Sequence, residues 1–228
     1  MSKKTILSWS SGKDSAWALH VLKQQEEIEI VGLVTTVNQT HQRVAMHAVR
    51  IKLLKEQADA VGLPLTILYI QHHCSNEEYQ SIMREYIEKA ETEGVECMAF
   101  GDLFLENIRE YREKNLRDTE ITPLFPLWGQ STIRLADEMI SNGLRTFVTC
   151  VDPRVLPSHF AGREFDQSFL SDLPDGVDPC GENGEFHSFV VDGPSFNKSL
   201  DVKVGKIVKR DGFVFADILP VKSLAEGF

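Results

Sequence analysis

Short apolar runs alternate with segments of helical periodicity along the first half of the chain. A continuous apolar run bounded by turn residues is typical of a buried strand, whereas apolar residues three or four positions apart indicate one face of a helix. The predicted strand–helix pairs are 5–9 with 16–23, 28–36 with 48–61, 64–70 with 76–93, and 95–100 with 104–116. This alternation predicts an α/β fold with a doubly wound parallel sheet.

The second half has a different pattern, and only one of the nine prolines, Pro64, precedes residue 120. We predict a helix over 132–142, a strand over 146–151, loops as far as 184, and strands over 186–191, 200–208 and 213–219. Asp211-Gly212 is a typical hairpin turn between the last two strands. We therefore expect two units, residues 1–122 and a smaller α+β subdomain of residues 123–228 that closes over the first.

The composition disfavours several classes of protein. Of the 228 residues, 42% are hydrophobic and 25% charged, as in ordinary globular proteins. A net charge of −10 disfavours a nucleic-acid partner. No apolar run is long enough to span a membrane, and the N-terminus leads directly into a strand, so neither a membrane anchor nor a signal peptide is expected. Four widely spaced cysteines without a C-x-x-C pair argue against zinc and iron–sulfur sites and fit reduced thiols in the cytoplasm.

The run Ser8-Trp9-Ser10-Ser11-Gly12-Lys13-Asp14-Ser15 joins the first predicted strand to the first helix. Such a turn leaves several backbone N–H groups unpaired at the positive end of the helix dipole, which suits phosphate. Gly12 allows close approach, Lys13 adds a positive charge, and the serines add hydroxyl donors. Asp14 suits the site only if it binds Mg²⁺ or caps the helix. The alternative is a plain strand–turn–helix junction capped by serine.

Two further segments end predicted strands of the same sheet, Thr35-Thr36 and Gly101-Asp102. Ligands of doubly wound sheets bind at the carboxyl ends of the strands, so three loops are expected to face one cleft. The predicted nucleotide-binding residues are Ser10, Ser11, Gly12, Lys13, Asp14, Ser15, Thr35, Gly101 and Asp102.

A second string, Gly181-Glu182-Asn183-Gly184-Glu185, precedes a predicted strand. Its glycines allow the backbone to approach a ligand, and its glutamates could bind Mg²⁺, hold an ammonium group or act as general bases. A surface Asn-Gly turn with solvated glutamates is the alternative. Arg43 and His47, in the polar segment 38–47, are candidate contacts to phosphate or substrate, or simply part of a loop that leads into a helix.

Ser10–Ser15 resembles S-G-G-K-D-S, the signature of the PP-loop ATP pyrophosphatases, with Ser11 in place of the first glycine; the Walker pattern is absent. Residues 181–188 resemble the G-E-G-G-E-Y-E-T string of the diphthine–ammonia ligase family, from which Asn183, Phe186, His187 and Ser188 depart. Arg112-Glu113, Pro126-Leu127-Trp128 and 192–196 are further matching pieces. The resemblance covers nearly the whole chain and is to a divergent, bacterial-type branch.

The resemblance implies an adenine nucleotide alpha hydrolase-like N-terminal domain and an ATP- and Mg²⁺-dependent ligase. ATP would be cleaved to AMP and pyrophosphate, and ammonia would be joined to a small-molecule or protein-borne carboxylate. Lys13, Glu182 and Glu185 would be catalytic, Asp14 would bind the metal, and Arg43, His47, Gly181, Asn183 and Gly184 would contact the substrate. A homodimer is compatible with the sequence. RNA modification, as in other PP-loop proteins, and a nucleotide sensor without chemistry are the alternatives.

Overall fold

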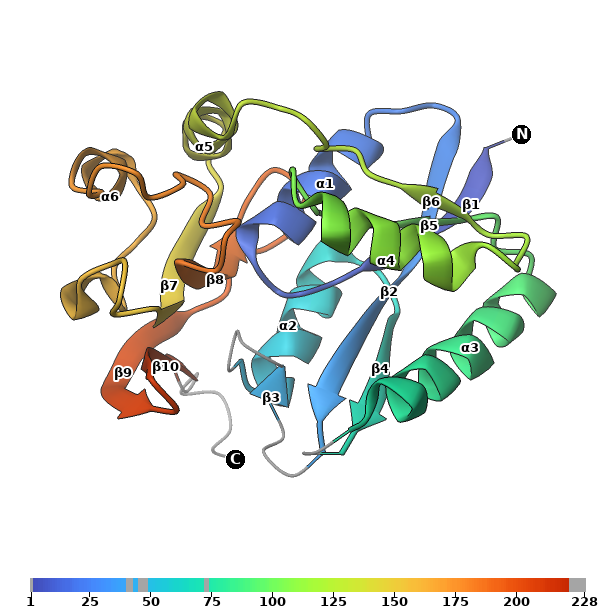
Figure 1. Ribbon diagram of the computed structural model, residues 1–228. Coiled ribbons are helices and arrows are strands. Elements are labelled where there is room, and N and C mark those ends of the chain that lie inside the picture. Colours follow the sequence, from blue (N-terminus) through green and yellow to red (C-terminus); the bar gives the residue numbers. More distant parts are fainter. Residues whose placement is uncertain (1, 40–42, 45–48, 72–73, 222–228) are drawn as a thin grey trace, which may run out of the picture.

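The computed structural model describes residues 2–39, 43–44, 49–71 and 74–221 and contains two β-sheets (Figure 1). The first sheet is built from β1 (Lys3–Ser8), β2 (Ile28–Asn38), β3 (Arg43–Val44), β4 (Leu65–Ile70), β5 (Cys97–Ala99) and β6 (Thr122–Leu124). Five strands are parallel, in the order β4-β2-β1-β5-β6. This is the doubly wound α/β arrangement that the alternation of strands and helices predicts.

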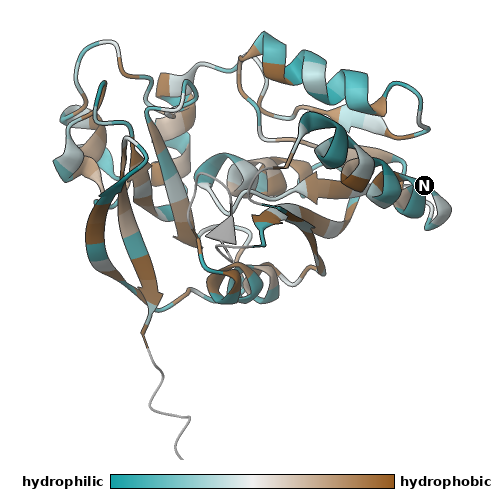
Figure 2. Cartoon of the chain, turned by 60° about the horizontal axis from the view of Figure 1, so that its bottom comes forward, coloured by the Kyte–Doolittle hydropathy of each residue, from teal (hydrophilic) through white to brown (hydrophobic). Residues whose placement is uncertain are grey.

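Four helices cover the two faces of this sheet: α1 (Lys13–Leu22), α2 (Ile51–Val61), α3 (Asn76–Thr92) and α4 (Glu106–Leu116). Alternate strand residues point to opposite faces. Leu7 of β1 therefore joins the core formed with α1 and α2, while its neighbour Ile6 joins a second core with Ile87 of α3 and Leu116 of α4. The strands of the first sheet are mainly hydrophobic, and the outer faces of the helices are mainly hydrophilic (Figure 2).

Two short strands of the first sheet were not expected: β6, at the predicted boundary between the two units, and β3. The sequence predicts a polar loop over 38–47, but Arg43 and Val44 form β3, which pairs antiparallel with Asn38 and Val37 at the end of β2. A two-residue strand carries no detectable periodicity. The side chain of Arg43 and the whole of His47 lie outside the described part of the structure, so their predicted contacts stay predictions.

The second sheet is antiparallel, in the order β8-β7-β10-β9. Its strands are β7 (Arg145–Val151), β8 (Phe186–Asp192), β9 (Val202–Arg210) and β10 (Phe213–Pro220), and α5 (Thr132–Ser141), η1 (Ser158–Phe160) and α6 (Gln167–Ser171) accompany them. Asp211 and Gly212 adopt φ of 51° and 84°, as the predicted hairpin turn requires. The short helices η1 and α6 fall where the sequence predicts only loops.

The two sheets share one hydrophobic core, which runs from Leu7 and Trp9 of the first unit to Phe189 and Val190 of β8. An ion pair of 2.5 Å also joins Arg50, at the start of α2, to Asp217 of β10. The predicted boundary between residues 122 and 123 falls at the start of β6, whose residues pair with β5; it stays a prediction. The continuous core fixes how the second sheet sits against the carboxyl ends of the parallel strands.

Candidate active site

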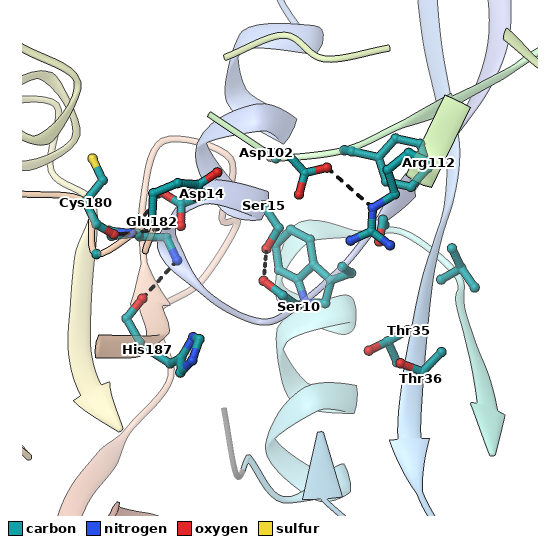
Figure 3. Close-up of a pocket in the computed structure, with 18 of the residues that line it drawn as sticks. Ser10, Asp14, Ser15, Thr35, Thr36, Asp102, Arg112, Cys180, Glu182 and His187 are labelled. Carbon is teal, nitrogen blue, oxygen red and sulfur yellow. Dashed lines mark hydrogen bonds and ion pairs between the residues drawn. The ribbon is translucent and has the colours of Figure 1, made fainter. Parts of the chain in front are cut away.

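A cavity of about 370 Å³ lies where the parallel strands end and the second sheet begins. In Figure 3, Thr35, Thr36 and Arg112 line one side, Cys180, Glu182 and His187 the other, and Ser10 and Ser15 lie between them. The other lining residues are Ser8, Trp9, Lys13, Asp14, Val34, Tyr79, Met83, Met98, Phe100, Gly101, Asp102, Gly181, Phe186 and Ser188. Both parts of the chain therefore contribute to a single site.

The Ser10–Ser15 segment, called here the phosphate loop, opens α1 at the floor of the cavity. Gly12 is the N-cap residue, and no side chain caps the helix. The Gly12 N–H donates to Ser10 Oγ at 3.3 Å, and the Lys13 N–H donates to Ser188 Oγ at 3.2 Å. The expectation that these N–H groups are unpaired is therefore wrong for two of them. Both groups have a serine hydroxyl as their acceptor.

Lys13 is the most enclosed charge of the site, with 2% of its surface exposed. Its Nζ donates to both oxygens of Asp14, at 2.9 and 2.8 Å, and to the Cys180 carbonyl. Burial is the largest single influence on the pKa of Lys13 and lowers it, but Asp14, Cys180 and Glu182 together outweigh burial and the pKa is raised. The ammonium is thus firmly charged, and a phosphate would bind it by exchanging one of these acceptors.

Asp14 is the predicted metal ligand. Within the described residues, no group of three or more His, Cys, Asp or Glu side chains is placed to hold a metal ion alone. Mg²⁺ commonly uses only one or two carboxylates together with substrate phosphates. Asp14 contributes to the raised pKa of Glu182, and both of its carboxylate oxygens accept from Lys13 Nζ. The metal role of Asp14 stays a prediction, and a magnesium ion bound there would have to replace at least one of the contacts to Lys13.

Glu182 reaches across the cavity from the second unit to the first. Its Oε1 accepts the Leu103 N–H at 2.8 Å, beside Asp102. Burial, with contributions from Asp14 and Asp102, raises the pKa of Glu182 to about 7, although the Leu103 N–H and Lys13 oppose the shift. A carboxyl group of this kind can gain or lose a proton near neutral pH, which suits proton transfer.

The neighbouring glutamate has a different position. Glu185 is buried, and its Oε1 accepts the Asp178 N–H at 3.1 Å and the Asn183 amide at 3.0 Å. Neither Glu185, Asn183 nor Gly184 lines the cavity. These residues instead hold the turn that presents Glu182. Gly181, which does line the cavity, has φ of 68°, and a Cβ there would lie 2.8 Å from the Phe186 ring.

The opposite wall combines predicted residues with others that the sequence analysis did not identify as site residues. At Gly101, a Cβ would lie 2.9 Å from the backbone carbon of Asp14, so only glycine fits against the phosphate loop. Asp102 accepts from Arg112 Nε at 3.4 Å, and the Arg112 guanidinium lies 5.0 Å from the centre of the Phe100 ring. Burial raises the pKa of Asp102, while Arg112 opposes the shift. In the sequence, Arg112 is one of many charges on a polar helix, so spacing gives no signal for it.

Apart from Arg43 and His47, whose side chains the structure does not describe, the predicted residues divide into two sets. Those that line the cavity are Ser10, Lys13, Asp14, Ser15, Thr35, Gly101, Asp102, Gly181 and Glu182. Ser11, Gly12, Asn183, Gly184 and Glu185 lie behind them and shape the loops. Cys180 lines the cavity, but burial raises the pKa of its thiol, so it is a poor nucleophile. No helix among the described residues is long and apolar enough to cross a membrane.

Comparisons with known proteins cover both units. The family described as diphthamide synthase N-terminal domain matches residues 3–122, and that described as diphthamide synthase C-terminal domain matches residues 131–221. Diphthine–ammonia ligases of Bos taurus and Homo sapiens are each 26% identical over 241 residues, which span 94% of this chain and 88% of the relative. The Danio rerio protein of the same name is 27% identical over 180 residues, or 71% of this chain and 69% of the relative. The chain therefore belongs to the diphthamide synthase family.

Proposed function

We propose that this protein is an ATP-dependent ligase that forms AMP and pyrophosphate and joins ammonia to a substrate carboxylate. The observation that carries the proposal is the phosphate loop with Lys13 at the floor of a cavity that both family domains line. Relatives named diphthine–ammonia ligase support the choice of reaction. The nature of the carboxylate, diphthine or another, is left to experiment.

The shape of the cavity suits an adenine nucleotide. Val34, Met83, Met98 and Phe100 give one part of the wall an apolar character that suits a base. Figure 3 shows Ser10 and Ser15 of the phosphate loop between Glu182 on one side and Thr35, Thr36 and Arg112 on the other. A nucleotide whose base occupies the apolar part would direct its phosphates over the loop and toward the second unit.

In the first step, a carboxylate oxygen of the substrate attacks the α-phosphorus, and the bond from that phosphorus to the bridging oxygen of the β-phosphate breaks. Pyrophosphate leaves with the electron pair, and an acyl-adenylate remains. Lys13 and the loop N–H groups would stabilise the charge that develops on pyrophosphate. Mg²⁺ held by Asp14 and the phosphates would neutralise part of the same charge.

In the second step, the nitrogen of ammonia attacks the acyl carbon, and the bond from that carbon to the AMP oxygen breaks. AMP leaves with the electron pair, and the nitrogen loses one proton as the amide forms. Glu182 is the proposed acceptor of that proton, because it lines the cavity and has a pKa of about 7. Glu185 is not given this role, because its carboxylate holds the turn behind the cavity.

Product analysis tests the proposal. The purified protein would be mixed with Mg²⁺, ATP labelled at the α-phosphate, ammonium and a pool of carboxylates that includes a cell extract. We expect labelled AMP and unlabelled pyrophosphate in equal amounts, dependent on the pool. ADP and phosphate as products would contradict the proposal. Tight ATP binding without turnover in every pool would favour a sensor instead.

A further inference from the structure

A buried glutamine lies directly beneath the phosphate loop. Gln57 of α2 has no exposed surface, and it does not line the cavity. Its Oε1 accepts the Trp9 indole N–H at 3.0 Å, while its Nε2 donates to the Ser11 carbonyl at 3.0 Å and to the Val190 carbonyl at 2.6 Å. One amide therefore joins the strand before the loop, the loop itself and β8 of the second sheet.

Ser11 shows what these bonds hold in place. Its φ of 73° lies in the left-handed region, which residues with a Cβ rarely adopt. The Ser11 carbonyl accepts a second hydrogen bond, from the Val190 N–H at 3.0 Å. The unfavourable conformation of a completely buried serine is thus maintained by two donors, one from each unit of the molecule.

The direction of the Ser11 carbonyl bears on the site because a peptide unit is planar and trans. When the carbonyl points into the core toward Gln57, the N–H of the next residue, Gly12, must point the opposite way. That N–H meets Ser10 Oγ, which lines the cavity. Gln57 therefore fixes the direction of a loop N–H group without touching the cavity itself.

The same contacts tie the loop to the second unit. β8 is an edge strand of the antiparallel sheet, so one row of its backbone groups has no strand partner. The N–H and the carbonyl of Val190 belong to that row, and they are used by Ser11 and Gln57. The conformation of the loop consequently depends on how β8 is seated.

We propose that Gln57 is a positioning residue for nucleotide phosphates: it holds the Ser11–Gly12 peptide in the orientation that directs the Gly12 N–H to Ser10 Oγ at the cavity lining, and it couples this orientation to β8. This inference rests on the proposed function, since it takes the loop to bind the phosphates of ATP. It assigns a role to a residue outside the predicted motifs.

The test compares two probes, ATP and adenosine, by calorimetric titration of the full chain. Gln57→Met retains the side-chain volume but removes all three hydrogen bonds. We expect the Kd for ATP to rise about tenfold, which corresponds to the loss of about one hydrogen bond to a charged group, and the Kd for adenosine to change less than about twofold. A general loss of structure would weaken the binding of ATP and of adenosine alike. A larger change in the Kd for ATP than in the Kd for adenosine therefore shows that Gln57 positions the loop for the phosphates.

Gln57→Glu provides a second variant in case the methionine variant does not fold. It keeps the size of the side chain and the acceptor for Trp9, but it sets carboxyl oxygens against the Ser11 and Val190 carbonyls. We expect Gln57→Glu to weaken ATP binding at least as much as Gln57→Met does. The matched control is Arg50→Gln, which breaks the ion pair with Asp217 between the same helix and the second sheet, and which should leave the Kd for ATP unchanged.

A folded Gln57 variant that binds ATP as tightly as the unaltered protein would overturn this inference. If the unaltered protein itself fails to bind ATP, the proposed function fails first. If it binds ATP and releases AMP while the Gln57 variants do the same with equal affinity, only the positioning role is lost. Circular dichroism and tryptophan fluorescence establish which variants are folded.

Discussion

Lys13 has a structural role in the fold and a proposed role in the reaction. Its ammonium bonds to Asp14 and to the Cys180 carbonyl, and it lies 5.4 Å from the centre of the Phe186 ring, so it joins the two units. As the only lysine of the phosphate loop, it is also the proposed ligand of the leaving pyrophosphate. If phosphate oxygens replaced the Asp14 or Cys180 contacts of Lys13, nucleotide binding would change the contacts between the two units.

A comparison of two lysine-to-alanine variants tests whether Lys13 takes part in the reaction. We expect Lys13→Ala to lower the rate of pyrophosphate release at least about 100-fold, as is typical when one preorganised donor to a developing anion is removed. The variant should also unfold at lower temperature, because Asp14 is left without its partner. Lys4→Ala, at an exposed position of β1, is the control. Near-normal release by Lys13→Ala would exclude Lys13 from the reaction.

Glu182 predicts a pH dependence. Because burial, Asp14 and Asp102 raise the pKa of Glu182 to about 7, its carboxylate can accept a proton only as the pH rises through that value. We expect the ratio of the wild-type rate to the Glu182→Gln rate to rise up to about tenfold per pH unit below pH 7 and to level off above it. The ratio cancels the contribution of free ammonia, whose concentration also rises with pH.

The exposed Glu110 gives the control, since Glu110→Gln should keep the wild-type profile. A ratio that stays flat from pH 6 to 8 would remove Glu182 from proton transfer.

The raised pKa of Glu182 has a consequence for folding: the folded state holds the Glu182 proton more tightly than the unfolded chain. The stability that this proton contributes is therefore lost as the pH rises from the ordinary range of a glutamate through about 7. The melting temperature of the wild type relative to Glu182→Gln should fall over that interval.

At the scale of elements, α3 links local sequence to the site, because it carries Tyr79 and Met83 to the cavity wall. The helix starts in a capping box: Ser75 Oγ accepts the Glu78 N–H at 3.2 Å, and the Glu78 carboxylate accepts the Ser75 N–H at 2.9 Å. Tyr79 and Met83 are the fourth and eighth residues of the helix. The cap therefore helps to set the position of two lining residues.

One substitution made at two positions of α3 tests this cap. Ser75→Ala removes the cap, and we expect it to lower the free energy of unfolding by about 1 kcal/mol. Ser81→Ala, at an exposed position inside the same helix, should raise it by up to about 0.5 kcal/mol, since alanine favours helix. Urea denaturation followed by circular dichroism measures both. Effects of equal sign at the two positions would contradict the assigned role of Ser75.

The pattern of the sequence predicts the long elements because their periodicity is carried by many residues, as in α2, where Leu53, Leu54, Ala58 and Val61 mark one buried face. It misses β3, β6 and α6, which have two, three and five residues and are too short to carry a periodicity. Gln57 is a different case, because it is a polar residue on the apolar face of α2. That mismatch is visible in the sequence, but the partners of Gln57, which are Trp9, Ser11 and Val190, cannot be predicted from it.

At the scale of the whole molecule, the site depends on contacts that no local pattern encodes. Glu182 reaches Leu103, Gln57 reaches Val190, and Lys13 donates its backbone N–H to Ser188. Each contact joins the first unit to the second across more than 70 residues of sequence, since even the nearest pair, Glu182 and Leu103, is 79 residues apart. The motifs predict which residues take part, whereas the fold decides that Glu182 and not Glu185 faces the cavity.

Because these contacts and the shared core join the two sheets, we expect the molecule to unfold in one transition. Tryptophan fluorescence and far-ultraviolet circular dichroism should give the same midpoint in urea. ATP at roughly 100 times its Kd should stabilise the fold by about 2.7 kcal/mol and slow hydrogen exchange in β8 as well as in β1. Two separate transitions, or protection of β1 alone, would mean that the units fold independently and that the second sheet is no structural part of the nucleotide site.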